Sequence, residues 1–272
     1  MIFKNVKKYE KLNEFILGLI ILSTLILSSC GLKKGQQESS DQIKRSAIVN
    51  GKSLSTKGEN SHSVVALISE NREGEALCTG SIVSDSVILT AAHCVDGNPQ
   101  KIQIIFGSDI KKTTDENIRL ADIAISHPNW GRNLKSGRAD LALVHFKGGL
   151  PTRYFPVTLA DKGTHLEVGQ DVTMIGYGVT SGEREKGSGK LRQTTTQIIG
   201  QKSPSEIVTN GESSSVCFGD SGGPAFINEG NENIQWGVAS AVENRACNEA
   251  SIHTEIISFG PWIHRTINRL EE

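Results

Sequence analysis

The sequence lacks an excess of charge of either sign. Its 29 Lys and Arg residues are nearly balanced by 30 Asp and Glu residues, which leaves a formal net charge of −1. Nucleic-acid binding needs clustered basic side chains against phosphates, so this balance gives no reason to expect a nucleic-acid partner. The one basic run, residues 4–8, stands at the N-terminus, where a targeting role explains it better.

The sequence also has few prolines, and little of it shows the spacing of apolar residues that predicts helices. Only 7 Pro stand against 28 Gly, a composition that suits a turn-rich β protein better than a helical bundle. Apolar residues recur at helical spacing over residues 258–270, which predicts a helix at the C-terminus. The segments that read as strands are short, β-branched and bounded by turn residues; they are residues 63–69, 80–90, 102–106, 141–146, 172–175, 194–199 and 236–240. The pattern predicts an all-β barrel or sandwich.

The N-terminus carries a targeting segment. Four Lys within the first eleven residues precede an apolar stretch, residues 15–27, that is shorter than the roughly 20 residues of a stable membrane span. A Ser-Ser-Cys-Gly sequence follows and resembles the bacterial lipobox. By that resemblance residues 1–29 are a lipoprotein signal peptide, and the Cys30 thiol becomes diacylated. The alternative is an ordinary signal peptide in which the cysteine stands by chance.

Cysteine usage fits an exported chain without a metal site. No Cys-x-x-Cys motif occurs among the five cysteines, and no pair of histidines has the spacing of metal ligands, so we expect no metal and no cofactor. An odd number of cysteines in an exported protein requires a reason for the unpaired one. Acylation of Cys30 would supply it and would leave four cysteines for two disulfides, which form in an oxidising compartment.

Three segments with chemical meaning lie in order along the rest of the chain. They are Thr90–Cys94 (TAAHC), Asp140–Val144 (DLALV) and Gly219–Pro224 (GDSGGP), with Ile48–Gly51 (IVNG) upstream. Together they resemble the chymotrypsin/trypsin family of serine proteases, from Ile48 to the C-terminus. The order His, Asp, Ser is that family's and differs from the orders in subtilisins and α/β-hydrolases. The resemblance implies that residues 48–272 form a protease domain of two packed six-stranded antiparallel β-barrels with a C-terminal helix.

The resemblance also implies a catalytic triad. His93 would take the proton of Ser221 and later deliver it to the leaving amine, while Asp140 would hold the imidazole in the required tautomer. The backbone N–H groups of Gly219 and Ser221 would form the oxyanion hole. We therefore expect a serine endopeptidase that acts on proteins and peptides as a monomer. The alternative is a non-catalytic lipoprotein that uses a protease fold as a binding module.

Activation by cleavage is implied by two further residues. In the family, proteolysis frees an Ile amine that pairs with a buried carboxylate, and Ile48 and Asp220 match these positions. Cleavage between Ala47 and Ile48 would then activate a zymogen, unless Ile48 simply begins a strand. The polar segment 30–47 is expected to be a flexible tether and propeptide. Its only cysteine is Cys30, so the exported chain should be lipid-anchored to a bacterial membrane before activation and released afterwards.

Two disulfides follow from the same resemblance. It pairs Cys78 with Cys94 next to the catalytic histidine, and Cys217 with Cys247 next to the specificity pocket. Each bond closes a moderate loop and should contribute roughly 2–4 kcal/mol to stability.

The specificity pocket that the resemblance implies departs from that of trypsin. Its base lies six residues before the nucleophile, at Ser215, where trypsins carry Asp, so a Lys or Arg side chain of the substrate has no partner there. The other assigned pocket residues are Ser240, Val242 and Ser251, of which Val242 and Ser251 should narrow the pocket as in elastase-like relatives. A small, uncharged residue is therefore expected at P1. His253, at the back of the pocket, leaves an acidic P1 residue open as an alternative.

Overall fold

Strands dominate the part of the chain that the structure describes. The computed structural model describes residues 48–54, 60–71, 74–97, 99–132, 135–230 and 232–272. The expected signal peptide, the tether and Cys30 lie outside these residues. The strands are β1 Lys52–Ser53, β2 Val64–Asn71, β3 Gly74–Ile82, β4 Val87–Thr90, β5 Lys101–Ile105, β6 Ile118–Ser126, β7 Ala142–Phe146, β8 Thr158–Leu159, β9 Asp171–Gly176, β10 Arg192–Ser203, β11 Glu206–Asn210, β12 Pro224–Glu229, β13 Glu232–Val242 and β14 Ala250–Glu255. The helices are the 3₁₀ turns η1 Ala92–Cys94, η2 Ile110–Lys112, η3 Asp115–Asn117 and η4 Ile257–Phe259, and the α-helix α1 Gly260–Glu271.

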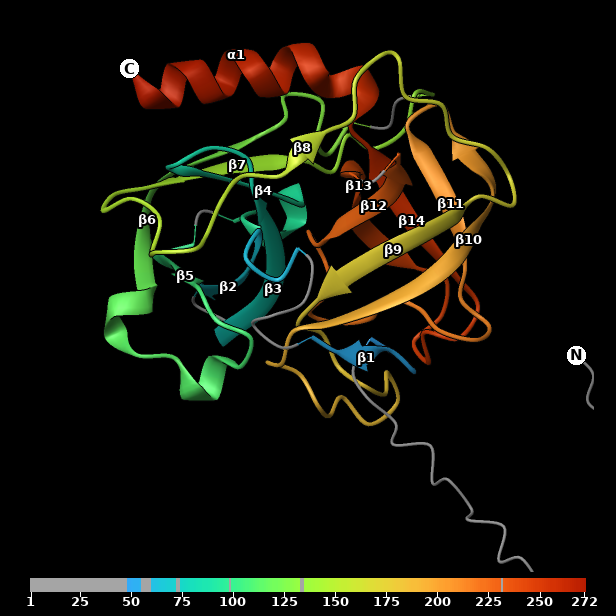
Figure 1. The fold of residues 1–272 in the computed structure, drawn as a ribbon, viewed down its shortest axis with the longest axis horizontal. Coiled ribbons are helices and arrows are strands. Elements are labelled where there is room, and N and C mark those ends of the chain that lie inside the picture. The colour runs from blue at the N-terminus through green and yellow to red at the C-terminus, as the bar shows by residue number, and fades with distance from the viewer. Residues whose placement is uncertain (1–47, 55–59, 72–73, 98, 133–134, 231) are drawn as a thin grey trace, which may run out of the picture. The chain divides into compact units, whose positions relative to one another are not determined.

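The first half of the described chain closes into a barrel. Its strands follow the order β2-β3-β4-β7-β6-β5, and β5 pairs back onto β2. Every pairing in this ring is antiparallel. Apolar side chains that alternate along the strands fill the interior, among them Val65, Leu67, Ile88, Ile104 and Leu143. The β2–β3–β4 and β5–β6–β7 strands lie on one side of Figure 1.

The second half closes into a second barrel, drawn in yellow to red beside the first in Figure 1. Strands β9, β10, β11, β14, β13 and β12 follow one another around it, and β12 pairs with β9 to complete the ring. Two short strands are added outside the ring, β1 on β10 and β8 on β13. Trp236, Met174 and Ile198 lie in its core. The expectation of two six-stranded antiparallel barrels is therefore confirmed.

The barrels dock through an apolar seam. Val64 and Ile105 of the first barrel pack against Ile175, Tyr177 and Phe226 of the second. The Tyr177 hydroxyl donates to the Gly107 carbonyl at 2.7 Å, so its one polar group is satisfied within the seam. Complete burial holds the pKa of the Tyr177 phenol well above its usual value. The site described below lies where these two bodies meet.

The C-terminal helix joins the two halves again. α1 carries Pro261 in its first turn and buries Ile263, Ile267 and Leu270. These side chains belong to the apolar core of the first barrel, although α1 follows the last strand of the second. The expected helix over residues 258–270 is thus present, with its first residues in the 3₁₀ turn η4. In the described residues, no helix is long and apolar enough to cross a membrane.

One predicted strand is in fact two. Residues 80–90 hold the end of β3, a turn and β4. The turn is closed by the Val83 N–H donating to the Val87 carbonyl at 2.9 Å. The polar sequence Ser84-Asp85-Ser86 has the residue types that favour turns, and this local chemistry interrupts the apolar run.

Candidate active site

The pairing of β4 with β7 brings the first two candidate residues together. Thr90 at the end of β4 is opposite Ala142 at the start of β7. His93 lies in η1 just after β4, and Asp140 lies just before β7, so both emerge at the same end of the barrel. The His93 Nδ1 atom is 2.8 Å from Asp140 Oδ2, and the His93 backbone N–H donates to Asp140 Oδ1 at 3.0 Å. Since a carboxylate only accepts, this contact places a hydrogen on Nδ1 and leaves Nε2 as the basic nitrogen.

The second barrel supplies a third hydrogen bond to the same carboxylate. Ser240, in β13, donates its hydroxyl to Asp140 Oδ2 at 2.6 Å. Asp140 is 1% exposed, so all three donors act on a carboxylate that is out of water. Sequence reasoning assigned Ser240 only to the specificity pocket and missed this contact. The two residues are 100 positions apart, and no local pattern links them.

Ser221 stands in a tight turn that is docked on the first barrel. The Ser221 carbonyl accepts from the Thr79 N–H at 2.8 Å, and the Gly222 N–H donates to the Ala239 carbonyl at 2.8 Å. Ser221 and His93 line the same cleft, which has a volume of about 320 Å³. The nucleophile candidate and the base candidate therefore face one space, although they belong to different barrels.

The backbone around Ser221 offers two unused donors. Gly219 has φ +95°, a conformation that an L side chain rarely adopts, and a Cβ there would lie 2.9 Å from the Gly178 Cα. Among the described residues, neither the Gly219 nor the Ser221 N–H has a hydrogen-bond acceptor. Two free N–H groups separated by one residue are the kind of donor set that can receive an oxyanion.

Asp220 is a buried carboxylate that is not among the residues lining the cleft. It is fully buried and accepts from the Gly178 N–H at 2.7 Å and the Cys217 N–H at 2.9 Å. Burial raises its pKa to about 7, although both hydrogen bonds and the charge of Arg192 act in the opposite direction. The carboxyl group therefore lacks a partner strong enough to offset desolvation.

Ile48 lies against the same stretch of backbone. Its side chain is fully buried, and the next residue, Val49, forms an isolated bridge with Ser215. Ser215 is two residues before Cys217, whose N–H binds Asp220. The segment that contains Ile48 and the buried Asp220 carboxylate thus both contact residues 215–217.

The cleft beside Ser221 is apolar and uncharged apart from His93. Its lining consists of His93, Val216, Cys217, Phe218, Ser221, Ala239, Ser240, Ala241 and Val242. Of the four residues assigned to the specificity pocket, Ser240 and Val242 line this cleft. Ser215 and Ser251 do not: the Ser215 hydroxyl donates to the Cys247 carbonyl at 2.5 Å, and Ser251 is fully buried. Val216 and Phe218 were missed, although their position beside the GDSGGP segment was a usable signal.

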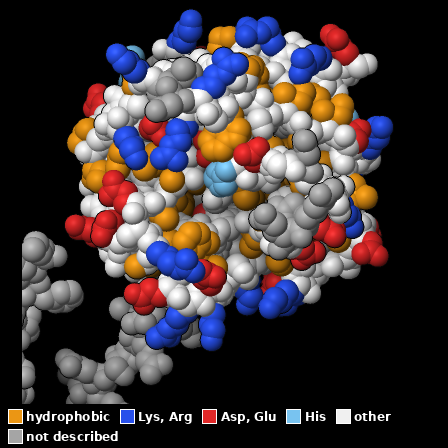
Figure 2. Space-filling model, turned by 180° about the vertical axis from the view of Figure 1, so that it is seen from behind, with side chains coloured by type: hydrophobic (Ala, Val, Ile, Leu, Met, Phe, Trp, Pro, Cys, Tyr) orange, Lys and Arg blue, Asp and Glu red, His pale blue; other side chains and the backbone are white. Residues whose placement is uncertain are grey.

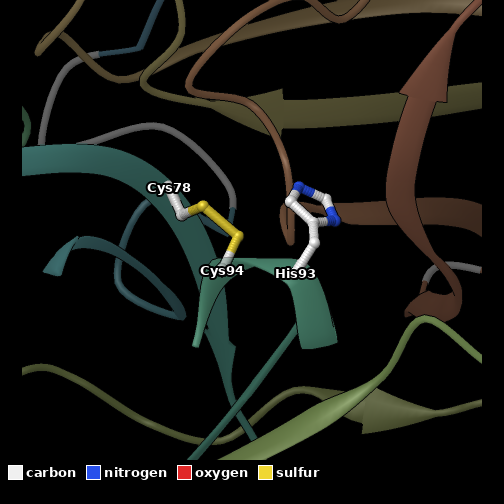
Figure 3. Close-up of side chains that lie close together, drawn as sticks. All are labelled: Cys78, His93 and Cys94. Atoms are coloured by element: carbon white, nitrogen blue, oxygen red, sulfur yellow. A yellow bond between two sulfur atoms is a disulfide. The ribbon is translucent and has the colours of Figure 1, made fainter. Parts of the chain in front are cut away.

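The four remaining cysteines form the two disulfides that the resemblance implies, Cys78–Cys94 and Cys217–Cys247. Figure 3 shows the first bond next to His93, with His93 and Cys94 both projecting from η1. Cys78, His93 and Cys94 are also the one group in the described part of the chain whose ligand atoms lie close enough to hold a metal ion. Because the two sulfurs are bonded to each other, the thiolates that a metal would bind are not available.

Charge on the surface is mixed. On the face shown in Figure 2, both basic and acidic side chains lie around the periphery, and several Lys or Arg side chains gather along the upper edge.

Comparison with known proteins agrees with this geometry. The family model described as Trypsin matches residues 48–263. Cathepsin G of Mus musculus is 26% identical over 219 residues, which cover 75% of this chain and 79% of that protein. Serine protease SP24D of Anopheles gambiae is 27% identical over 240 residues, 82% of either chain. Chymotrypsin-like elastase family member 1 of Macaca fascicularis is 25% identical over 214 residues, 70% of this chain and 78% of the relative. The chain therefore belongs to the trypsin family of serine proteases.

Proposed function

We propose that this chain is a serine endopeptidase whose triad is Ser221, His93 and Asp140. The observation that carries the proposal is the arrangement of His93. Its Nδ1 is held at 2.8 Å by a buried carboxylate, and its ring lines the cleft that Ser221 also lines. A hydroxyl is a weak nucleophile until a positioned base removes its proton, and this arrangement supplies such a base.

The reaction follows from these positions. His93 Nε2 takes the Ser221 proton as Oγ bonds to the substrate carbonyl carbon, and the carbonyl π electrons move to the oxygen. The Gly219 and Ser221 N–H groups donate to that oxyanion. The imidazolium then protonates the leaving amine as the C–N bond breaks, which leaves an ester on Ser221. Water, deprotonated by His93, hydrolyses the ester by the same steps in reverse. Asp140 stabilises the imidazolium throughout and keeps its own charge.

The cleft favours a small, uncharged P1 side chain. Val216, Ala239, Ala241 and Val242 contribute apolar residues to its lining, and His93 is the one residue with an acidic or basic side chain among the described residues that line it. Ser215, which takes the position of the trypsin Asp, gives its hydroxyl to the Cys247 carbonyl and is 1% exposed. A Lys or Arg side chain would lose its hydration without gaining a counter-charge. His253 is fully buried and is not among the residues that line the cleft, so its ring is not available to pair with a substrate carboxylate. An acidic P1 residue is therefore unfavourable.

Activation is proposed to occur by cleavage between Ala47 and Ile48. The support is the buried Asp220 carboxylate, whose desolvation is not fully offset, together with the buried Ile48 side chain. Asp220 and the Ile48 segment both contact residues 215–217. A new ammonium at Ile48 would give the carboxylate an opposite charge inside the protein. The turn that carries Gly219 and Ser221 would then be fixed by an ion pair.

The proposed precursor is lipid-anchored and exported. Residues 1–29 would be its signal peptide, Cys30 its acylation site and residues 30–47 its tether. The other four cysteines are bonded to each other, so no disulfide would retain the domain after cleavage. We propose that the monomeric enzyme is then released to act on protein substrates without a cofactor.

A covalent probe tests the central proposal. The chain that begins at Ile48 should be labelled by a fluorophosphonate and should cleave peptides with Ala or Val at P1. The substitution Ser221→Ala should abolish labelling, and His93→Ala should lower turnover roughly 10⁴-fold. Ser84→Ala, in the turn between β3 and β4, is the matched control and should change neither. A folded, processed chain that neither labels nor cleaves would support the binding-module alternative instead.

A further inference from the structure

The backbone at Asp140 is held in an unusual turn. Ala139, directly before it, has φ +50° and is 2% exposed. The Leu141 N–H donates to the Ala139 carbonyl at 2.8 Å, which closes a three-residue turn centred on Asp140. A left-handed Ala is strained, and such a conformation persists only where its surroundings over-determine it. Something outside the turn must therefore hold it.

The segment just before the turn is attached to the second barrel. The Ser136 carbonyl accepts from the Ser205 N–H at 3.1 Å and from the Ser205 hydroxyl at 2.5 Å. Gly137 has φ +108°, and a Cβ there would lie 2.4 Å and 2.5 Å from the Ser205 and Ser203 hydroxyls. The backbone thus lies directly on the turn that connects β10 to β11. These contacts join residues about 70 positions apart in sequence.

A buried carboxylate completes the attachment. The Glu206 side chain is 7% exposed, and its Oε1 lies 3.5 Å from Arg138 Nε. Its Oε2 accepts from the Ser203 hydroxyl at 2.8 Å. A carboxylate is costly to bury unless its oxygens are paired. Both oxygens are paired here, one of them with a residue only two positions before Asp140. Glu206 therefore draws the strained turn toward the second barrel.

We propose that Glu206 is a positioning residue for the triad and acts by fixing the 136–139 backbone from which Asp140 projects. The inference rests on the proposed function, since it gives a role to the orientation of Asp140. The second barrel then fixes Asp140 at two points. Ser240 binds its carboxylate, and Glu206 holds the backbone that precedes it. Loss of Glu206 should let the left-handed Ala139 relax and turn the carboxylate away from His93 Nδ1.

The first test needs no activity. In the inert Ser221→Ala chain, the proton on His93 Nδ1 should give a resolved downfield NMR signal, because a charge-assisted hydrogen bond deshields it and slows its exchange. Glu206→Ala should broaden or remove this signal. Glu206→Gln should retain it, because its amide oxygen can accept from Arg138 while its NH2 group donates to the Ser203 hydroxyl oxygen. Glu255→Ala is the matched control. Glu255 is a buried carboxylate in β14 that accepts from the Ser258 N–H and lies outside the 136–139 segment.

The second test uses turnover of a short peptide by the processed enzyme. Glu206→Ala should lower kcat tenfold or more with little change in KM, and Glu206→Gln should restore most of the loss. If Glu206→Ala does not fold, Ser203→Ala and Arg138→Ala each remove one partner of the Glu206 carboxylate. Each should cause a smaller loss of the His93 signal and a smaller decrease in kcat. The inference would be overturned if folded variants at Glu206, Ser203 and Arg138 kept the His93 signal and the kcat of the parent. A wild-type chain without activity would overturn the proposed function alone, because the NMR result still decides the role of Glu206.

Discussion

The uncut chain should lose stability as the pH rises, because the burial of Asp220 is only partly offset by its two hydrogen bonds and by the charge of Arg192. The pKa of this carboxyl is raised from an ordinary 3.8 to about 7 by burial. The folded state therefore binds the proton more tightly than the unfolded state does. The stabilising contribution is complete below about pH 4 and is lost as the pH rises through about 7.

The size of the effect follows from the shift. A rise of about three pKa units corresponds to about 4 kcal/mol, at roughly 1.4 kcal/mol per unit. This is a large fraction of the roughly 5–15 kcal/mol that stabilises an ordinary domain. After cleavage, an ammonium at Ile48 would stabilise the ionised carboxylate, and the loss between about pH 4 and 7 should disappear as long as the amine keeps its proton. Cleavage would then stabilise the fold most at pH values where the carboxyl group is ionised and the amine is still protonated.

The assay is urea unfolding of the uncut Ser221→Ala chain, which cannot digest itself, at about pH 5, 7 and 9. Asp220→Asn is the perturbation. It removes the titrating group but satisfies only one of the two backbone donors, so it should destabilise the chain at about pH 5. Between about pH 5 and pH 9 the variant should gain up to a few kcal/mol relative to its parent. Comparing the two at each pH cancels the titration of all other groups. A difference that stays constant with pH would refute the reasoning.

Other perturbations follow from contacts already described. Val242→Gly should widen the cleft and move the P1 preference toward larger apolar side chains, as read from kcat/KM over a peptide series; an unchanged ranking would argue against its place in the pocket. Ser240→Ala removes a hydroxyl donor from the carboxylate of the proposed triad and should lower kcat roughly 10- to 150-fold, which corresponds to the roughly 1.5–3 kcal/mol of a hydrogen bond to a charged group. Replacing Cys217 and Cys247 together by Ala should lower the free energy of unfolding by about 2–4 kcal/mol, measured in urea. Burial lowers the pKa of His253 from 6.5 to about 4, so the fold should lose stability as the pH falls from about 6.5 to about 4; His253→Gln should flatten that part of the melting-temperature profile, and an equal acid loss in the variant would contradict this origin.

Sequence reasoning succeeded where the signal is local. The segments around His93 and Ser221 each hold their chemistry within a few consecutive residues, so they could be recognised one by one. The two barrels followed from the resemblance that those segments carry. Most of the predicted strands are apolar runs whose residue types favour extended backbone.

It failed where burial breaks the usual pattern. β14 buries Ser251, His253 and Thr254 as completely as its apolar residues, so it gave no alternation to detect. β6 shows the reverse problem, since Leu120 and Ile123 are 55% and 45% exposed. Neither strand has the hydrophobic period that a single sequence can reveal.

Contacts between the barrels could not be predicted from the sequence, for a different reason. The bond from Ser240 to Asp140 and the attachment of Arg138 to Glu206 depend on how two separately closed sheets dock. Strand register and the docking of the sheets are set by the packing of many side chains at once. No local pattern in the sequence reveals which distant residues they bring together. Ser251, which the sequence assigned to the specificity pocket, is fully buried in β14 and is not among the residues that line the cleft.

The division of the proposed triad between two barrels has a consequence for the newly made chain. His93 and Asp140 belong to one folding unit, and Ser221 with its free N–H donors belongs to the other. A chain in which only one barrel has formed holds a base without a nucleophile, or a nucleophile without a base. Cleavage of peptide bonds is then a property of the finished assembly alone. Partly folded copies that meet before folding is complete could be substrates, but they cannot yet be proteases.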